Sequence, residues 1–281
     1  MNRALHKTVI SPKTSVFSFK FRELFKYRDL VWLFVKKNYS TRYKQTILGS
    51  AWLLITPILA IICYSVIFGT VAGLSTDGLP KLVFYLSGNI IWTFFNKCVV
   101  DNSNVFVNNA FLFGKVYFPR LTIPVSNVIT AFFDFCIQFA LLVVLMLYYH
   151  FTGWHFNVNS SILFFPLVML QTALFGLGLG LLITSITTKY RDLSILVHFI
   201  MQMWMYGTPI VYSFSIVPAR FERLYLLNPL TCVIIVFKHG FFGAYSIPVQ
   251  EWLISWGTTI FFAVLGIFAY NKTEKTFIDR I

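Results

Sequence analysis

Acidic residues are scarce in this chain, whose 281 residues include ten Asp and Glu against 23 Lys and Arg. Charged residues make up only 12% of the chain and hydrophobic residues 57%, whereas a soluble domain carries about 25% charged residues. This shortage of charge excludes a soluble globule and predicts a polytopic membrane protein. The positive balance does not indicate nucleic-acid binding, because 11 of the 23 cations precede residue 45. A cationic cluster beside an apolar segment is typical of a cytoplasmic anchor at an anionic membrane surface.

Three further absences narrow the possible functions. The four cysteines form no CxxC pair, which argues against a disulfide framework, a zinc site or any other metal site. The first 46 residues contain no apolar core of a secretory signal. No G-x-x-x-x-G-K-[ST] phosphate loop occurs, so we expect the chain to bind no cofactor of its own and not to hydrolyse ATP itself.

The N-terminal segment 1–46 is predicted to be cytoplasmic. From Phe17 to Tyr39, bulky apolar residues recur at helical spacing, with lysines and arginines between them. This pattern predicts an amphipathic helix lying in the membrane interface. A cytosolic helix packed on a partner protein is the alternative.

Six apolar runs are each long enough to span a membrane, for which about 20 residues suffice. We predict an all-α fold with a single six-helix domain over 47–271 and spans near 47–71, 82–106, 121–149, 161–187, 193–213 and 250–270. A seventh span over 222–243 is disfavoured by Asn228-Pro229 and by Lys238-His239-Gly240. With six spans and cytoplasmic termini, 18 cations lie inside and 4 outside, as the positive-inside bias requires. We therefore predict two external re-entrant half-helices over 219–243 and a cytoplasmic tail over 272–281.

A few polar residues lie within the predicted spans. Lys97 and Asp101 are four residues apart, so they share a helix face and are expected to pair. Asp134 and Gln138 are expected to serve helix packing or to face a pore, although intramembrane acids are functional candidates by default. The run Gly176-Leu177-Gly178-Leu179-Gly180 predicts close helix packing and not a nucleotide site.

The segment 108–120 separates two apolar runs and carries two cations and no acid. Pro119 must end any helix there, so we predict a short cytoplasmic helix over 108–118. Its aromatic residues are expected to be exposed for another protein to contact: Phe111, Phe113, Tyr117 and Phe118. An interfacial loop with its aromatics among lipid headgroups is the alternative.

This segment resembles the coupling segment of type 2 ATP-binding-cassette export permeases of the polysaccharide and polyol phosphate branch. The pattern N-x-x-L-x-x-K-x-x-F-P-R of that family is matched by Asn109, Leu112, Lys115, Phe118, Pro119 and Arg120. Further stretches resemble the family at Arg42-Tyr43-Lys44 with Trp52 and Pro57, at Arg191-Asp192, at Thr208-Pro209 with Tyr212, and at Leu227-Asn228-Pro229-Leu230.

The resemblance implies a homodimer of permease chains with two separate ATPase subunits, which would bind ATP and magnesium. It also implies an interface helix and an ATPase-coupling role for Asn109, Leu112, Phe113, Lys115, Phe118, Pro119 and Arg120. One chain of six helices is too small to enclose a channel for a sugar polymer, which also favours a dimer.

Three further sets of residues are candidates for direct roles. Arg42 and Lys44 are cations at the predicted cytoplasmic mouth, where they either snorkel and set topology or meet the diphosphate of a lipid-linked substrate. Aromatic rings could cover the apolar faces of sugars along a pore. The candidates for this lining are Trp52, Trp92, Phe95, Trp204, Tyr206 and Tyr212. Asn228 and Pro229 are candidates for an external gate.

These observations predict the membrane subunit of an ATP-driven exporter in the bacterial inner membrane. O-antigen is the first choice of lipid-linked cargo, with capsule polysaccharide and teichoic acid as alternatives. A proton-coupled lipid-oligosaccharide flippase using Lys97, Asp101 and Asp134 is a different class. A membrane glycosyltransferase or ligase around Glu222, Arg223 and His239 is a third, and it is disfavoured because no cluster of acids faces the outside.

Overall fold

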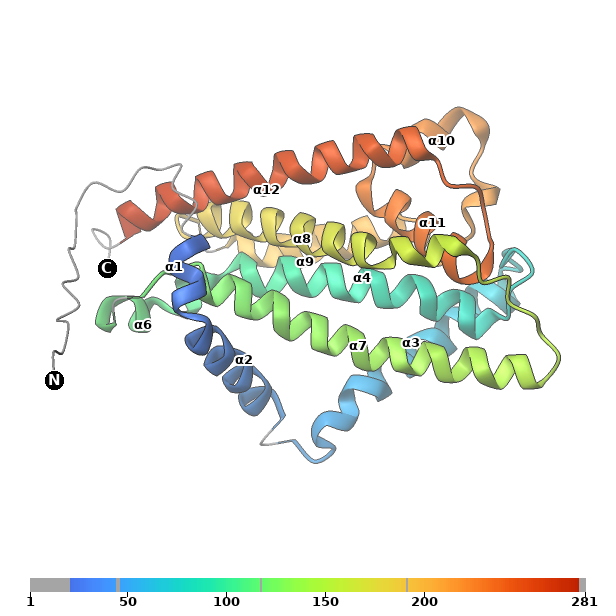
Figure 1. Cartoon of the computed structure of the whole chain (residues 1–281), viewed down its shortest axis with the longest axis horizontal. Coiled ribbons are helices and arrows are strands. Elements are labelled where there is room, and N and C mark those ends of the chain that lie inside the picture. Colours follow the sequence, from blue (N-terminus) through green and yellow to red (C-terminus); the bar gives the residue numbers. More distant parts are fainter. Residues whose placement is uncertain (1–20, 44–45, 117, 191, 278–281) are drawn as a thin grey trace, which may run out of the picture.

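The computed structural model describes residues 21–43, 46–116, 118–190 and 192–277. All regular secondary structure in these ranges is helical (Figure 1). In chain order the elements are α1 (Phe21–Lys26), α2 (Arg28–Tyr43), η1 (Gly49–Ala51), α3 (Trp52–Val66), η2 (Ile67–Val71), α4 (Lys81–Ser103), α5 (Val105–Asn108), α6 (Ala110–Lys115), α7 (Thr122–Phe151), η3 (Ser160–Phe164), α8 (Phe165–Thr187), α9 (Leu193–Tyr206), η4 (Phe214–Ile216), α10 (Ala219–Leu226), α11 (Pro229–Phe242) and α12 (Val249–Phe277).

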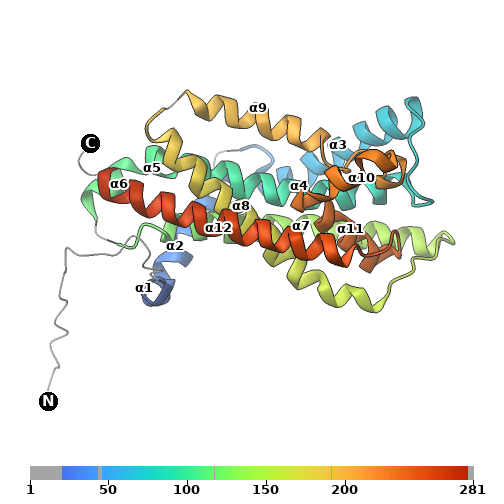
Figure 2. The ribbon, with the colours of Figure 1, turned by 90° about the horizontal axis from the view of Figure 1, so that it is seen from above.

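The long helices form a bundle around α4. This helix packs against α7 and α8, with α3 on one side, and α12 lies along α8 on the other (Figures 1 and 2). Every residue from Val83 to Trp92 in α4 is buried. Helix α4 is therefore the centre of the bundle, enclosed by protein along this stretch.

Four helical segments of the described chain are long and apolar enough to cross a membrane. They are Gly49–Val71, Thr122–Phe151, Ser160–Thr187 and Val249–Lys275, and each matches a predicted span. The bent pair α10–α11 would make a fifth if it counts as one span. The predicted spans 82–106 and 193–213 correspond to α4 and α9, which fall outside this set. Helix α9 is shorter than predicted because the chain turns at Gly207, before Pro209.

The predicted amphipathic helix over 17–39 is divided in two over the residues that the structure describes. Helices α1 and α2 meet at a turn around Tyr27. Helix α2 buries Val31, Phe34 and Val35 on one face and exposes Lys36 and Lys37 on the other. Its buried face packs near the beginning of α7 (Figure 1), so the amphipathic pattern serves contact with the bundle.

Residues 219–242 form two helices whose axes are bent by 99°, as the prediction of two half-helices over 219–243 requires. The Asn228 side chain accepts a hydrogen bond from Leu230 N, and Pro229 occupies the first helical position of α11, where a proline costs no hydrogen bond. Gly243 ends α11 in the left-handed conformation, at φ 67°. Helix α11 is almost wholly buried, whereas α10 is largely exposed.

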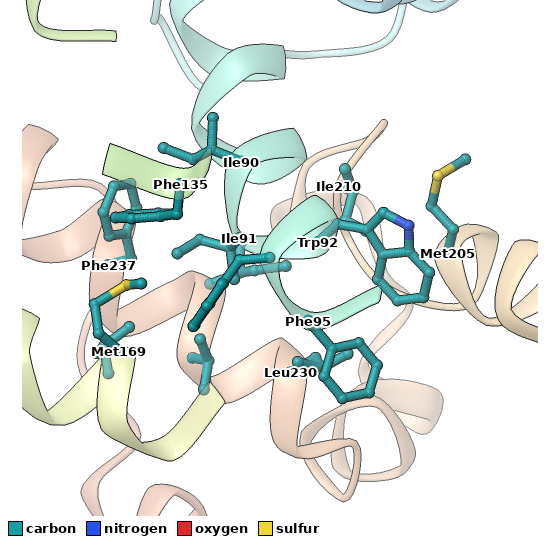
Figure 3. Close-up of a cluster of buried hydrophobic side chains, with 14 of the residues drawn as sticks. Ile90, Ile91, Trp92, Phe95, Phe135, Met169, Met205, Ile210, Leu230 and Phe237 are labelled. Carbon is teal, nitrogen blue, oxygen red and sulfur yellow. The ribbon is translucent and has the colours of Figure 1, made fainter. Parts of the chain in front are cut away.

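Aromatic and aliphatic side chains from α3, α4 and each of the helices α7 to α12 meet in the main core, part of which is drawn in Figure 3. Ile91 and Phe95 of α4 lie there with Phe135 of α7 and Phe237 of α11. A second cluster lies at the end of the bundle near α6, around Phe106 and Tyr270.

The glycines of α8 allow neighbouring helices to approach closely, as the sequence predicts. A Cβ atom built on Gly176 or Gly180 would lie 2.5 Å or 2.6 Å from a side-chain atom of α4. A Cβ on Gly178 would lie 2.7 Å from the backbone of Ala263 in α12. The alternate glycines thus admit α4 on one side and α12 on the other.

Candidate functional site

A network of charged side chains joins α2, α4 and α7. Asp134 of α7 is 1% exposed and accepts hydrogen bonds from Tyr39 Oη at 3.0 Å, Arg42 Nη1 at 3.0 Å and Lys97 Nζ at 2.5 Å. Arg42 Nη2 also lies 3.2 Å from Asp101 Oδ2. Two cations and two acids from three helices therefore neutralise one another.

The predicted pairing of Lys97 with Asp101 is wrong. Both side chains do lie on the side of α4 that faces this network, but Lys97 reaches across to Asp134 and Asp101 is paired with Arg42. A carboxylate as buried as Asp134 must have positively charged or hydrogen-bonding partners, and α7 brings it against α4. The sequence offered no partner for Asp134 because its partners are remote along the chain.

A cavity of about 480 Å³ lies next to this network, which is within the ~300–1,000 Å³ range of small-molecule sites. Its lining comes from α2, α3, α4 and α7 and combines two cations, one indole ring and several neutral polar groups: Arg42, Trp52, Leu53, Thr56, Pro57, Ala60, Asn89, Thr93, Lys97 and Gln138. Gln138 Oε1 is buried and has no hydrogen-bond partner among the described residues. The cavity lining thus presents a guanidinium, an ammonium and neutral hydrogen-bonding groups, and the two positive charges are balanced by Asp101 and Asp134.

Of the six aromatic residues predicted to line a pore, Trp52 alone borders this cavity, and its side chain is 44% exposed. Phe95 is 0% exposed and stacks on Phe175, with ring centroids 5.3 Å apart. Trp92 is also buried. The prediction that Trp92 and Phe95 line a pore is therefore corrected to a packing role, because the central position of α4 encloses both rings.

The other three aromatic candidates lie on or just beyond α9. Trp204 is partly buried and meets Phe95 edge-on at 5.6 Å. Tyr206 is exposed at the end of the helix. Tyr212 donates a hydrogen bond to the carbonyl oxygen of Tyr206, and its hydroxyl oxygen also lies 3.1 Å from the hydroxyl of Tyr225, which can donate to it. These three rings do not border the cavity beside Arg42.

Of the two cations predicted to bind a substrate headgroup, the structure describes only Arg42. Arg42 borders the cavity and belongs to the ion network. Lys44 lies outside the described residues.

The segment 108–120 is more buried than predicted. Instead of one helix it contains the end of α5 and the short helix α6, which meet at Asn109. Phe111 is 75% exposed and Lys115 Nζ lies 3.9 Å from its ring centroid. Phe113 and Phe118 are buried in the cluster around Phe106. The prediction that all the aromatics are exposed is therefore wrong for these two, and Tyr117 lies outside the described residues.

The C-terminal end of this segment anchors it to the bundle. Pro119 and Arg120 are buried. Arg120 Nη1 donates a hydrogen bond of 2.7 Å to the Glu274 carbonyl oxygen, and its guanidinium lies 5.5 Å from the Phe113 ring. Leu112 is partly buried against the same cluster. Phe111 and Lys115 are exposed beside these buried residues, as are Asn108, Gly114 and Val116.

The opposite end of the bundle holds a cluster that sequence reasoning missed. The Asp77 carboxylate accepts hydrogen bonds from Ser213, Ser215 and Tyr245, and it thereby joins three loops. Burial alone would raise the pKa of Asp77, but the three hydrogen bonds and the ammonium of Lys238 outweigh it and lower the pKa below its ordinary value. Burial and the bond to Asp77 raise the pKa of Tyr245. Only the turn residues beside Asp77 marked this region in the sequence.

The predicted gate residues have a clear local role. Asn228 caps α11 through Leu230 N, and its Nδ2 donates to Thr208 Oγ1 at 2.9 Å. Pro229 is buried at the start of α11. The two residues fix the sharp bend between α10 and α11.

Comparison with known proteins identifies the family. The profile described as ABC-2 type transporter matches residues 29–242. The chain is 26% identical to the O-antigen export system permease protein RfbA of Klebsiella pneumoniae, over 89% of this chain and 94% of that protein. It is 27% identical to the protein of the same name from Myxococcus xanthus, over 90% of this chain and 96% of that relative.

A more distant relative has a less specific name. The inner membrane transport permease YadH of Escherichia coli K12 is 21% identical over 84% of this chain and 92% of that protein. The family profile covers well over half of the chain and includes α2, the ion network, the cavity and the bent pair α10–α11. The chain therefore belongs to the ABC-2 type transporter family.

Proposed function

We propose that this chain is the membrane subunit of an ATP-driven exporter that moves a lipid-linked polysaccharide of the O-antigen type across the bacterial inner membrane. The observation that carries the proposal is the alignment with two O-antigen export permeases over nearly the full length of all three chains. Capsule polysaccharide and teichoic acid are the alternative cargoes, since they share a polymer linked to a lipid through phosphate.

The cavity beside Arg42 supports a phosphate-bearing substrate. Arg42 and Lys97 both border it, and guanidinium and ammonium groups are the usual phosphate partners. In the structure their positive charges are balanced by Asp101 and Asp134. A diphosphate entering the cavity would compete with these carboxylates for the same donors, while Trp52 and Gln138 offer a ring face and an amide to a sugar.

The power for transport is proposed to come from two separate ATPase subunits bound to a homodimer of this chain, with both termini in the cytoplasm. Phe111 and Lys115 on α6 are the proposed contact for the ATPase, because both are exposed. The burial of Phe113, Phe118 and Arg120 supports the transmission of force from α6 to the bundle, since a loosely attached helix would absorb a push without moving its neighbours.

Reconstitution of the chain with its co-purifying ATPase tests this function. The complex in liposomes is expected to expose lipid-linked polysaccharide on the far side of the membrane only with ATP. An ATPase variant that binds but does not hydrolyse ATP serves as the control. Export by the isolated chain, with no ATPase present, would refute the proposal.

The headgroup site has its own test in Arg42→Gln combined with Lys44→Gln. We expect export to fall while the complex still assembles, as judged by size-exclusion chromatography. Arg42→Lys, which keeps the charge beside Asp134, is expected to retain more export than Arg42→Gln. Lys81→Gln, at an exposed position at the other end of α4, is the control for the loss of a single positive charge, as in Arg42→Gln alone. Unchanged export in the double variant would show that Arg42 and Lys44 do not bind the substrate.

The proton-coupled flippase is the second class. Asp134 is its central residue, but Tyr39, Arg42 and Lys97 already occupy the carboxylate. This arrangement favours a structural bridge between helices over a proton relay. Export driven by a pH gradient in the absence of ATP would reverse that conclusion.

A further inference from the structure

A groove separate from the cavity lies along the contact between α2 and α7. Its volume is about 630 Å³. The lining is apolar apart from one lysine and the tyrosine hydroxyl: Trp32, Val35, Lys36 and Tyr39 of α2, with Phe133, Cys136, Ile137 and Ala140 of α7. The ring centroids of Trp32 and Tyr39 lie 5.8 Å and 6.4 Å from that of Phe133, both edge-on.

The groove is open on the face of α7 that points away from the bundle. Phe133, Cys136 and Ala140 are all exposed there. Helix α7 is one of the segments long and apolar enough to span a membrane. In a bilayer this outward face of α7 meets lipid and not water, so an acyl chain is the natural neighbour of these side chains.

A whole phospholipid also needs a binding partner for its phosphate, and Lys36 can provide it. Its side chain borders the groove and is exposed, and it takes part in none of the salt bridges of the described residues. A lysine on an amphipathic helix extends its ammonium towards the headgroup level while its methylenes cover apolar surface. Among the described residues that line the groove, the only charged side chain is that of Lys36, and its positive charge is available to a phosphate.

A wall of the groove is shared with the ion network. The Tyr39 ring faces the groove, and its hydroxyl donates to Asp134 on the inner side. Val35, one turn earlier, is buried beneath the groove. The bottom of the groove is thus fixed by packing and by a hydrogen bond, which makes it a formed site and not a chance gap between mobile side chains.

We propose that this groove binds one phospholipid of the surrounding bilayer, an anionic one, with an acyl chain against Phe133, Cys136 and Ala140 and the phosphate at Lys36. The volume lies within the ~300–1,000 Å³ range of formed ligand sites. Charge complementarity selects an anionic headgroup, because an added positive charge near the membrane surface favours anionic lipids. The lipid would seal the contact between α2 and α7 and stabilise the position of α2.

Native mass spectrometry of the full-length protein provides the first test. The protein is released from nanodiscs of phosphatidylcholine and phosphatidylglycerol that contain no polysaccharide precursor, and the retained lipid is counted. We expect retained phosphatidylglycerol, with about fivefold weaker retention in Lys36→Gln. Lys37→Gln removes the same charge from a neighbouring position outside the groove and should change retention less than twofold. Equal losses in the two variants would refute a specific site.

A second pair of variants tests the apolar part of the groove. Ala140→Phe fills the groove from an exposed position on α7, and Val144→Phe introduces the same ring one turn away, outside the lining. Phosphatidylglycerol with a photoreactive acyl chain should label the α7 peptide around Cys136 in the wild type and in Val144→Phe, and at least about threefold less in Ala140→Phe, as one blocked site among general lipid contacts would give. Equal labelling in all three would overturn the proposal.

The remaining occupants are distinguished by the same experiments. Retention of an added polyprenyl phosphate in place of phosphatidylglycerol would identify the groove as a site for the substrate tail and would refute a resident phospholipid. Protection of Cys136 from labelling by lipid on assembly with partner subunits would show that protein covers the groove, and this would also refute the proposal. Neither result depends on export activity, so the proposed function is tested separately.

Discussion

Arg42 and Asp134 are 92 residues apart in the sequence, yet Arg42 Nη1 lies 3.0 Å from Asp134 Oδ2. The contact fixes the end of the N-terminal helix α2 against the middle of α7, and Lys97 adds α4 to the same carboxylate. Asp134 of α7 therefore accepts hydrogen bonds from both α2 and α4, and the geometry of the adjacent cavity depends on this residue.

Loss of this acceptor should destabilise the protein strongly. Asp134→Asn leaves the charges of Arg42 and Lys97 without their shared partner, and breaking a buried ion pair in this way costs about 3–5 kcal/mol. Asp101→Asn is the matched control. Its carboxylate is partly exposed, so the loss should be about 1 kcal/mol or less. Unfolding in mixed detergent micelles measures both, and equal losses would contradict the central role of Asp134.

Two glycine-to-alanine substitutions should have opposite effects on the free energy of unfolding. Gly178→Ala places a methyl group 2.7 Å from backbone atoms of Phe262 and Ala263. Because backbone cannot move aside as a side chain can, we expect a loss of about 1–3 kcal/mol. Gly257→Ala on α12 meets nothing within 4 Å and should gain up to about 1 kcal/mol from helix propensity. The same unfolding assay applies, and stabilisation by Gly178→Ala would show that α8 and α12 are not in such close contact.

Two phenylalanines two residues apart in α6 should have different roles. Phe113→Ala removes a buried ring and should lower stability by about 3 kcal/mol. Phe111→Ala removes an exposed ring, so it should leave stability within about 0.5 kcal/mol and weaken ATPase association in a pull-down. Lys115→Gln is expected to weaken that association too. If Phe111→Ala binds the ATPase as the wild type does, α6 does not contact it through this ring.

The Asp77 cluster predicts an acid sensitivity confined to low pH. The pKa of Asp77 is lower in the folded protein than its ordinary value of 3.8, so the folded state favours the ionised carboxylate. Its contribution to stability is complete above pH 3.8 and is lost as the pH falls below that value and through the folded pKa. The test is the difference in melting temperature between the wild type and Asp77→Asn from pH 7 to pH 3. A difference that grows as the pH falls would contradict this sign.

Much of the fold could be predicted because the position of a membrane span depends on residues that are neighbours in the sequence. A lipid-exposed helix satisfies its own backbone hydrogen bonds, so a continuous apolar run is enough to locate it, as with α3, α7, α8 and α12. The bend between α10 and α11 was also predictable, since Asn228 and Pro229 act on the chain immediately beside them. The extent of α9 was not, because the turn at Gly207 lies within an apolar run.

The candidate site was predictable only in part. Arg42 and Trp52 were identified, and both border the cavity. The exposure of Phe111 and the burial of Phe113 could not be predicted, because apolar side chains close together on a short helix give no indication of which one the bundle covers. The same holds for Phe95, whose ring would suit a pore as well as a core until the central place of α4 is known.

The sequence by itself determined the class of protein, the position of most membrane helices and the family resemblance, since apolar length, helix caps and short motifs are properties of neighbouring residues. The tertiary structure alone decided which charges meet, which aromatics are enclosed and where the cavity and the groove lie. These features arise from contacts between residues up to 168 positions apart, such as Asp77 and Tyr245. Such contacts depend on how the helices pack around α4, and no local pattern in the chain records that packing.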